Sequence, residues 1–378
     1  VGSVRCVYET GGFAATSNRY VDAHGAVSTG MLATRKLAEN KQEYAGPLTE
    51  AELTKIVAQY KAVMAQSEEK QDANYGTLYQ PIDDILNFMI SVLTPDEGYD
   101  ETVLDSVTED SVQVFYTWYQ KNMKWMADQY GKTPEQKDYL EKKYSEIILP
   151  LQYESYGAWD TMIMYAETYS IVLAILVGFI CAGIFADDFQ TKADAVFFAS
   201  KYGRSKAIKN KILAGVVATT MIYWTGIVLL SAISFGIMGT SGMHTPYQMS
   251  EAYSIYIMTY GQYYALTVAC GYIASLLAAS LAMLVAAKMH TISVAVCIPF
   301  FLYCLLPFIG RVLSSYTKVF NLIPTILTNV EASVRVPLLY QIGTHVIRQV
   351  PLVMVMYTVL SIVLLPLIYR SFRRYGRA

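Results

Sequence analysis

The stretch MIMYAETYSIVLAILVGFICAGIF, residues Met162–Phe185, decides the fold of this chain. It runs for 24 residues with one charged side chain, that of Glu167. A helix needs about 20 mostly apolar residues to cross the roughly 30 Å of hydrocarbon in a bilayer, and in lipid it must satisfy its own backbone hydrogen bonds. The stretch therefore predicts a membrane-spanning helix.

Similar apolar stretches recur through the rest of the chain. Of its 378 residues, 54% are hydrophobic and 16% are charged, which is not the composition of an average soluble protein. We predict an all-α, polytopic membrane helix bundle with five spans in this chain. The four further spans are expected at Ile212–Met238, Ala265–Ala287, Ile292–Ile309 and Pro351–Tyr369.

The two halves of the chain carry opposite charge. Residues 1–160 hold 25 acidic and 14 basic side chains, a net charge of −11, whereas residues 161–378 hold 6 and 15, a net charge of +9. Nearly all the long apolar stretches lie in the basic half. Two regions with different surroundings are indicated: a domain at residues 1–158 and a transmembrane domain at residues 159–378.

Basic residues in the connections between spans predict the orientation, because Lys and Arg gather on the cytoplasmic side. One side of the predicted bundle carries eleven basic residues and the other carries four. The side with eleven, which includes the loop at residues 186–211 and the C-terminus, is expected to be cytoplasmic. Its members are Lys192, Lys201, Arg204, Lys206, Lys209, Lys211, Lys288, Arg370, Arg373, Arg374 and Arg377.

Five spans with a cytoplasmic C-terminus place residues 1–158 outside the cytoplasm. The chain begins with Val1 rather than Met, and its first residues resemble neither a signal peptide nor an anchor. We therefore expect an upstream span in the native protein, giving six spans with both ends inside.

The extracytoplasmic domain is predicted to be mainly helical. Thr49 with Glu52 has the spacing of a capping box, and Thr133 precedes Pro134, a residue favoured at the first position of a helix. Residues 111–130 form an amphipathic pattern whose apolar face we assign to core packing, with ligand contact as the alternative. That face comprises Val112, Phe115, Trp118, Tyr119, Met123 and Met126.

No catalytic or metal-binding constellation is apparent in the sequence. The four His residues lie far apart, and no nucleotide-binding loop or nucleophile motif occurs. Only Cys6 falls in the extracytoplasmic domain, so no disulfide framework is available there. We expect a chain that is not an enzyme, with no cofactor, metal or nucleic-acid partner of its own.

Glu167 is the only acidic residue within the predicted spans. An ionisable group in a membrane helix is a functional candidate, because isolating a charge in hydrocarbon costs at least a few kcal/mol. Glu167 lies about five residues inside the outer end of its span, about 8 Å along the helix. The alternative is that its carboxylate reaches headgroups or water.

The loop at residues 186–211 combines charge with an apolar centre. We predict a short helix at Thr191–Ser200 along the inner face of the membrane, with Val196 and Phe197 directed toward a protein groove or the lipid. The chain then turns at residues 201–204, and Ser205 is expected to cap the helix that re-enters the membrane. The alternative is that the charges only set topology and the Phe pair only anchors the loop.

The order of residues in this loop resembles the cytoplasmic loop of ABC-2-type transporter permeases. Phe185-Ala-Asp-Asp188 precedes Thr191, a short apolar helix, Gly203-Arg204, Ile208 and Lys211. In that family the loop is the coupling helix that docks on a separate ATPase subunit. The resemblance implies ATPase-coupling roles for Asp187, Asp188, Thr191, Val196, Phe197, Phe198, Tyr202, Gly203, Arg204 and Lys206.

The resemblance implies a membrane permease subunit of a bacterial plasma-membrane ABC-2-like transporter, expected to be an exporter. Its partners would be an ABC ATPase subunit holding ATP and Mg, a second permease copy or a paralogue, and the lipid membrane. It also implies an outer re-entrant hairpin at residues 314–349, where Pro324 can break a helix; a plain outer loop is the alternative. A secondary transporter, or a membrane-anchored receptor or sensor using the outer domain, remain the alternative functions.

Overall fold

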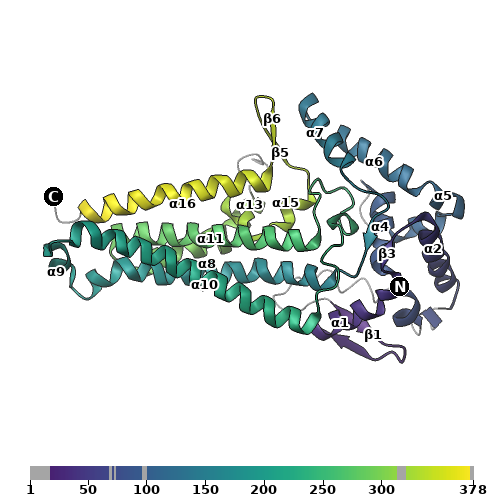
Figure 1. Ribbon diagram of the computed structural model, residues 1–378, viewed down its shortest axis with the longest axis horizontal. Coiled ribbons are helices and arrows are strands. Elements are labelled where there is room, and N and C mark those ends of the chain that lie inside the picture. Colours follow the sequence, from purple (N-terminus) through teal and green to yellow (C-terminus); the bar gives the residue numbers. More distant parts are fainter. Residues whose placement is uncertain (1–17, 68–69, 72–73, 96–99, 313–320, 375–378) are drawn as a thin grey trace.

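The computed structural model describes residues 18–67, 70–71, 74–95, 100–312 and 321–374. The molecule is elongated, with a helix bundle along its long axis and an N-terminal domain at the end opposite to the C-terminus (Figure 1). The positions of Cys6, of most of the loop at 94–100, and of residues 314–320 of the expected hairpin lie outside the described residues.

The N-terminal domain is mainly helical, as predicted. Its described residues form two antiparallel strand pairs, β1 (Arg19–Val21) with β2 (Val27–Thr29) and β3 (Gly46–Pro47) with β4 (Gln152–Tyr153). The second pair joins residues 46–47 to residues 152–153, near the end of the domain. The α-helices are α1 (Met31–Asn40), α2 (Glu50–Met64), α4 (Asp83–Leu93), α5 (Glu109–Gln113), α6 (Phe115–Tyr130) and α7 (Pro134–Ser145).

Both predicted helix starts in this domain are confirmed. The Thr49 hydroxyl accepts a hydrogen bond from the backbone N–H of Glu52 at the start of α2. The Thr133 hydroxyl accepts one from the N–H of Gln136 at the start of α7, with Pro134 at the first helical position. Each cap satisfies a backbone donor that the helix itself leaves unpaired.

The amphipathic pattern at residues 111–130 forms two helices rather than one, because the chain breaks between α5 and α6 at Val114. Most of the predicted apolar face is buried. The exception is Trp118, which is 40% exposed and whose assignment to the core is therefore wrong. The confirmed core members are Val112, Phe115, Tyr119, Met123 and Met126.

Five helices in the described part of the chain are long and apolar enough to cross a membrane, and they coincide with the five predicted spans. The protein is thus an all-α, membrane-embedded helix bundle joined to a mainly helical domain. The fourth span is composite, because a π-helical turn at residues Phe301–Leu305 separates two helical pieces. The spans are α8 (Gly157–Gln190), α10 (Ile208–Met238), α11 (Tyr260–Met289), α12 (Ile292–Phe300) with α13 (Leu306–Val312), and α16 (Gln349–Arg374).

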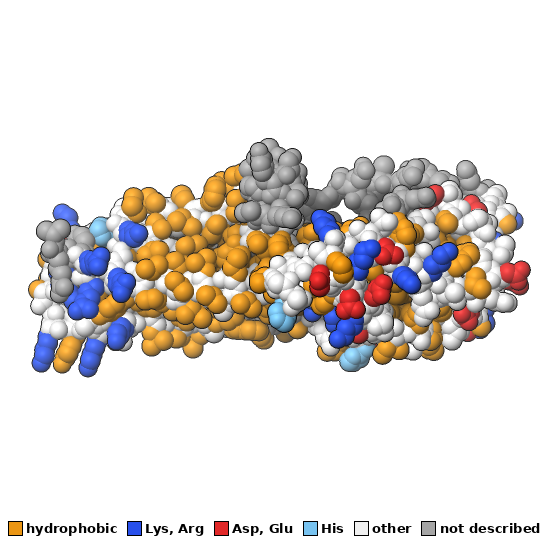
Figure 2. All heavy atoms as spheres, turned by 90° about the horizontal axis from the view of Figure 1, so that it is seen from above, with side chains coloured by type: hydrophobic (Ala, Val, Ile, Leu, Met, Phe, Trp, Pro, Cys, Tyr) orange, Lys and Arg blue, Asp and Glu red, His pale blue; other side chains and the backbone are white. Residues whose placement is uncertain are grey.

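Helix α11 is the centre of the bundle and packs against α8, α10, α12 and α16. In the most apolar stretch of α11, 67% of the residues are buried. The corresponding share is 22% in α10 and in α16, and 17% in the composite fourth span. Glycines allow the closest approaches: a Cβ on Gly271 of α11 would lie 2.1 Å from the Ser170 hydroxyl of α8. The outer helices leave a broad apolar belt around the bundle (Figure 2), which is the surface that lipid or another membrane chain covers.

The segment between α10 and α11, residues 239–259, packs into the N-terminal domain. Tyr253 is buried there, its ring 5.6 Å from that of Tyr119, and its hydroxyl donates to the Val92 carbonyl at 2.8 Å. The N-terminal domain and the bundle consequently share one hydrophobic core. The domain boundary at residue 158 is therefore not a boundary in the packing.

The described part of the expected hairpin is only partly helical. A 3₁₀ turn at Pro324–Thr328 is buried against α11 and α16, and α15 (Glu331–Arg335) follows it. Strands β5 (Leu339–Ile342) and β6 (His345–Arg348) then form an antiparallel pair. The expectation of a helical hairpin over the whole of 314–349 is therefore wrong for residues 339–348, where a Gly343 turn with φ of 62° supports a β-hairpin.

Candidate functional site

The predicted coupling residues lie at one end of the bundle, which we call the basic end. It comprises the last turn of α8, the short helix α9 (Asp194–Ala199), a π-helical turn at Gly203–Ala207, and the C-terminal turn of α16. Figure 2 shows Lys and Arg side chains gathered there, beyond the apolar belt. Figure 1 places α9 beside the C-terminal end of α16.

Helix α8 runs five residues further than predicted and ends at Gln190. Asp187 and Asp188 therefore belong to its last turn rather than to a loop. The Thr191 hydroxyl donates to the Asp187 carbonyl at 2.7 Å, which satisfies one of the carbonyls left unpaired at the helix end. Lys192 then adopts a left-handed conformation with φ of 56°, and this reverses the chain toward α9.

The turn after α9 requires a glycine. A Cβ on Gly203 would lie 1.8 Å from the Phe197 carbonyl oxygen, so any larger residue displaces the backbone. The prediction that Ser205 caps the following helix is wrong: its hydroxyl donates to the Tyr202 carbonyl at 3.4 Å, and the helix begins through the π-helical turn. The close approach at Gly203 fixes α9 against the start of α10.

Phe198 is buried, with 9% of its surface exposed, so its side chain is covered mainly by other parts of this chain. Its ring lies 5.2 Å from that of Phe372 in α16 and 6.3 Å from that of Phe189 in α8. Phe372 in turn lies edge-on to Phe185 at 5.0 Å. We call Phe185, Phe189, Phe197, Phe198 and Phe372 the Phe cluster. It holds α9 to the ends of α8 and α16, because buried aromatic pairs add to the stability gained from area burial.

Lys211 links α10 to α8 beside the Phe cluster. Its ammonium lies 2.7 Å from the Asp188 carboxylate and donates to the Ile184 carbonyl at 2.6 Å. It also lies 5.2 Å from the centre of the half-buried Phe197 ring, within cation–π range. Asp188 and Phe197 thus take part in the internal contacts of the basic end.

Arg204 links the turn after α9 to the last span. Its guanidinium donates to the Arg373 carbonyl at 3.2 Å and lies 4.8 Å from the centre of the Phe198 ring. The contact with Arg373 satisfies a carbonyl near the C-terminus of α16, where a cation is also favoured by the helix dipole. Arg204 therefore positions α9 relative to α16.

The outward surface of the basic end consists of five of the predicted residues together with Lys192 and Lys201, which were not among them. Val196 is 76% exposed and Tyr202 is 50% exposed, although both are apolar or aromatic. The ammonium groups of Lys201 and Lys206 lie 5.5 and 4.9 Å from the Tyr202 ring centre. We call this surface the α9 face: Asp187, Thr191, Lys192, Val196, Lys201, Tyr202 and Lys206.

Glu167 lies near the other end of the bundle, and its carboxylate accepts hydrogen bonds from backbone N–H groups. Its carboxylate accepts from the N–H of Val330 at 2.7 Å and from that of Glu331 at 3.0 Å, at the start of α15. The expectation that it reaches headgroups or water is not needed, since the chain itself supplies its partners. Nothing in the sequence identified residues 330–331 as those partners, because they are 163 and 164 positions away.

Charged side chains surround the same region. Arg335 of α15 pairs with Glu251 from the segment between α10 and α11 and with Glu331 at 3.1 Å. Burial raises the pKa of Glu251, and the Arg335 guanidinium opposes that shift. The three residues tie α15 to the segment that enters the N-terminal domain.

Within the described residues no group of three or more His, Cys, Asp or Glu side chains is placed to hold a metal ion. Comparisons of the chain with protein-family models, curated proteins and solved structures find no match. The functional argument therefore depends on the geometry of the chain itself.

Proposed function

We propose that this protein is the membrane-spanning permease subunit of an ABC-2-like transporter. Transport would be driven by ATP hydrolysis in a separate ATPase chain. The observation that carries the proposal is the α9 face, an exposed apolar and basic surface on a short helix that is itself anchored firmly to three spans. Exposed apolar side chains on an anchored helix favour a protein partner over solvent.

The anchoring contacts supply a means of coupling. The Phe cluster, Lys211 and Arg204 join α9 to α8, α10 and α16. A partner that pushes or pulls α9 therefore moves the ends of these spans together, since packed side chains transmit displacement rather than absorb it. ATP and Mg would act in the partner chain, and this chain would convert the motion into movement of substrate.

The charge distribution supports an orientation with the basic end in the cytoplasm. Most of the described basic residues of the bundle gather at that end, and the N-terminal domain is acidic. The proposed location is accordingly the plasma membrane of a bacterium, with the N-terminal domain outside and export as the direction. A second permease copy or a paralogue would cover part of the apolar belt on α10, α12 and α16.

Site-specific photo-crosslinking tests the proposal. A photoreactive amino acid is placed at Val196 in the α9 face and, as a control, at Leu360, which is exposed in the apolar belt of α16. Both proteins are expressed in the native organism, irradiated, and the crosslinked chains identified by mass spectrometry. We expect an ATPase with a nucleotide-binding loop at position 196 and none at 360.

The accompanying functional measurement uses the purified complex in nanodiscs. Val196→Asp should lower retention of the ATPase while leaving the permease folded, because a carboxylate then replaces an apolar contact. If position 196 crosslinks no ATPase in cells where the protein reaches the membrane, the permease proposal is wrong.

A further inference from the structure

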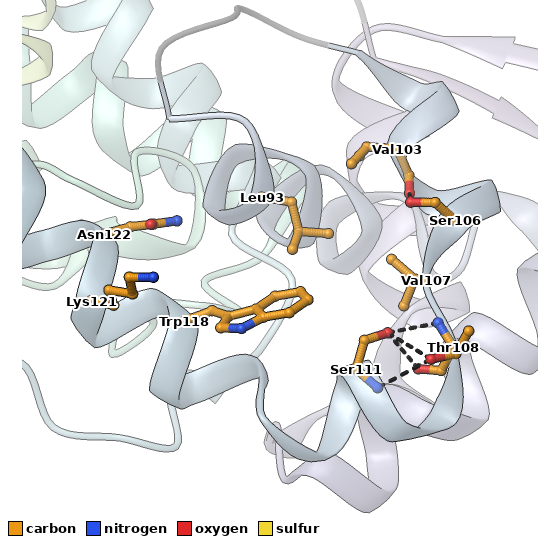
Figure 3. A pocket seen from close by; sticks show the side chains of 9 residues that line it. All are labelled: Leu93, Val103, Ser106, Val107, Thr108, Ser111, Trp118, Lys121 and Asn122. Carbon is orange, nitrogen blue, oxygen red and sulfur yellow. Dashed lines mark hydrogen bonds between the residues drawn. The ribbon is translucent and has the colours of Figure 1, made fainter.

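A pocket of about 410 Å³ opens on the N-terminal domain, between α4, α5 and α6. Its volume lies within the range of small-molecule sites. Three aliphatic side chains, Leu93, Val103 and Val107, form part of its wall. Figure 3 shows the Trp118 indole extending toward Leu93 and Val107, with Lys121 and Asn122 on the neighbouring turn of α6.

Trp118 is the unusual member of this pocket. Its neighbours on α6, Phe115 and Tyr119, are 1% and 0% exposed, whereas Trp118 is 40% exposed. A large indole left open in a concave surface with aliphatic walls offers a flat apolar face to a ligand ring. Stacked or edge-on rings gain about 0.5–1.5 kcal/mol beyond the burial of area.

The polar groups of the pocket determine which charge it favours. The Thr108 and Ser111 hydroxyls are hydrogen-bonded to each other, and the Ser111 hydroxyl also accepts from the Thr108 backbone N–H. The Ser106 hydroxyl donates to the Val103 carbonyl at 2.7 Å. Lys121 is exposed and has no ion-pair partner among the described residues. None of the described residues that line the pocket carries a carboxylate. Its charged group is therefore an ammonium in a domain that is acidic as a whole.

We propose that this pocket binds a small aromatic carboxylate, with the ring on the Trp118 indole and the carboxylate at Lys121. A charge-assisted hydrogen bond from the ammonium fixes the acidic end, and the aliphatic wall excludes water from the ring. The proposal does not depend on the transport function proposed above.

The pocket is connected to the bundle by two hydrogen bonds to one atom. The Asn122 amide donates to the Val92 carbonyl at 2.9 Å, and the Tyr253 hydroxyl donates to the same carbonyl at 2.8 Å. Tyr253 belongs to the segment that leads into α11. A ligand that binds the folded pocket therefore stabilises contacts shared with the bundle, and the melting temperature of the whole protein becomes a readout.

The test uses the full chain, purified in detergent, with three probes: indole-3-acetate, tryptamine and cyclohexylacetate. Tryptamine has the same ring with a cationic end, and cyclohexylacetate has the acidic end without an aromatic ring. Binding is measured by calorimetry and by the shift in melting temperature. We expect indole-3-acetate to bind with a Kd below about 1 mM and the other two at least about tenfold more weakly.

Variants locate the site. Trp118→Ala should weaken indole-3-acetate binding by about tenfold and Lys121→Gln by about fivefold, with Trp118→Phe retaining most of the affinity. Matched controls on the same helix are Tyr130→Ala and Lys124→Gln, both exposed and outside this pocket, which should leave the Kd unchanged. A melting temperature that equals that of the wild type in the absence of ligand verifies that each variant is folded.

Three results would overturn the proposal: no saturable binding of indole-3-acetate up to 10 mM (about a tenfold margin over the expected Kd), an unchanged Kd in folded Trp118→Ala, or tryptamine binding as tightly as the acid.

Discussion

Replacing Glu167 by Ala should release α15 from the first span. The wild-type carboxylate accepts two backbone hydrogen bonds, from Val330 at 2.7 Å and Glu331 at 3.0 Å. Both bonds end on the same carboxylate oxygen, Oε1, and alanine removes it. The Val330 N–H is then left in a buried position, since that residue is 0% exposed, whereas Glu331 is exposed and its N–H can turn to water.

The loss of local stability can be estimated from the environments of these two N–H groups. A hydrogen bond to a charged group contributes about 1.5–3 kcal/mol, and leaving a buried donor unsatisfied costs about 1–3 kcal/mol. We therefore expect α15 to lose about 3 kcal/mol of local stability, counting the Val330 donor fully and the Glu331 donor little. Since each 1.4 kcal/mol is tenfold in an equilibrium constant, opening of this segment should become about 100-fold more frequent. Glu167→Gln keeps one uncharged acceptor and should cost about 1 kcal/mol.

Cysteine labelling measures that opening. Ser333 in α15 is 3% exposed, so a Cys at this position reacts with a maleimide only when the segment opens. The labelling rate of Ser333→Cys is compared in a background without other cysteines, in detergent, with Glu167, Ala or Gln at position 167. Thr168→Ala, an exposed position on the same helix, is the control.

The expected order of labelling rates is Ala fastest, Gln intermediate, and wild type equal to the Thr168→Ala control. Equal rates in wild type and Glu167→Ala would refute the reasoning, because they would show that the two hydrogen bonds do not hold α15 in place.

Two further predictions concern the basic end, and a third concerns His290, the residue that follows α11. Phe198→Ala should destabilise the protein by about 3 kcal/mol, because it empties the Phe cluster, whereas Val196→Ser should leave the melting temperature nearly unchanged. Arg204→Gln should keep the fold but increase proteolysis between α9 and α10, because the bond to the Arg373 carbonyl is lost. Partial burial lowers the pKa of His290 below its usual value of about 6.5, so the folded state binds fewer protons than the unfolded chain. Stability is then full above about pH 6.5 and falls at lower pH, and a series of melting curves should show a smaller fall in His290→Gln.

The membrane half could be predicted from the sequence because one physical requirement dominates it. A helix must be long and apolar to lie in lipid, and five stretches met that requirement at positions the structure confirms. Their ends were less predictable: α8 continues through Asp187 and Asp188 to Gln190, in the basic end that follows its apolar stretch. Local capping by Thr49 and Thr133 was also readable, since each cap depends on residues within one helical turn.

The roles of individual aromatic residues could not be predicted in the same way. Phe198 and Trp118 both belong to apolar patterns on helices, yet Phe198 is buried and Trp118 is open. What separates them is the neighbour from a distant part of the chain. Phe372 covers Phe198 from 174 positions away, and no described side chain covers Trp118 to that extent. A pattern in one helix gives the face, and the tertiary partner decides whether that face is core or surface.

The boundary between the two halves shows the same dependence on distant partners. Charge and composition divide the chain near residue 158, but the segment at 239–259 returns from the bundle and inserts Tyr253 among residues of α4 and α6. In the other direction, the Tyr119 hydroxyl donates a hydrogen bond to the Ala252 carbonyl. These buried contacts must break before the N-terminal domain can turn independently of α11, and breaking them exposes apolar area and unpaired polar groups together. The N-terminal domain is therefore a rigid extension of the central span, so that a displacement of α11 at the basic end and an event at the Trp118 pocket act on one connected core.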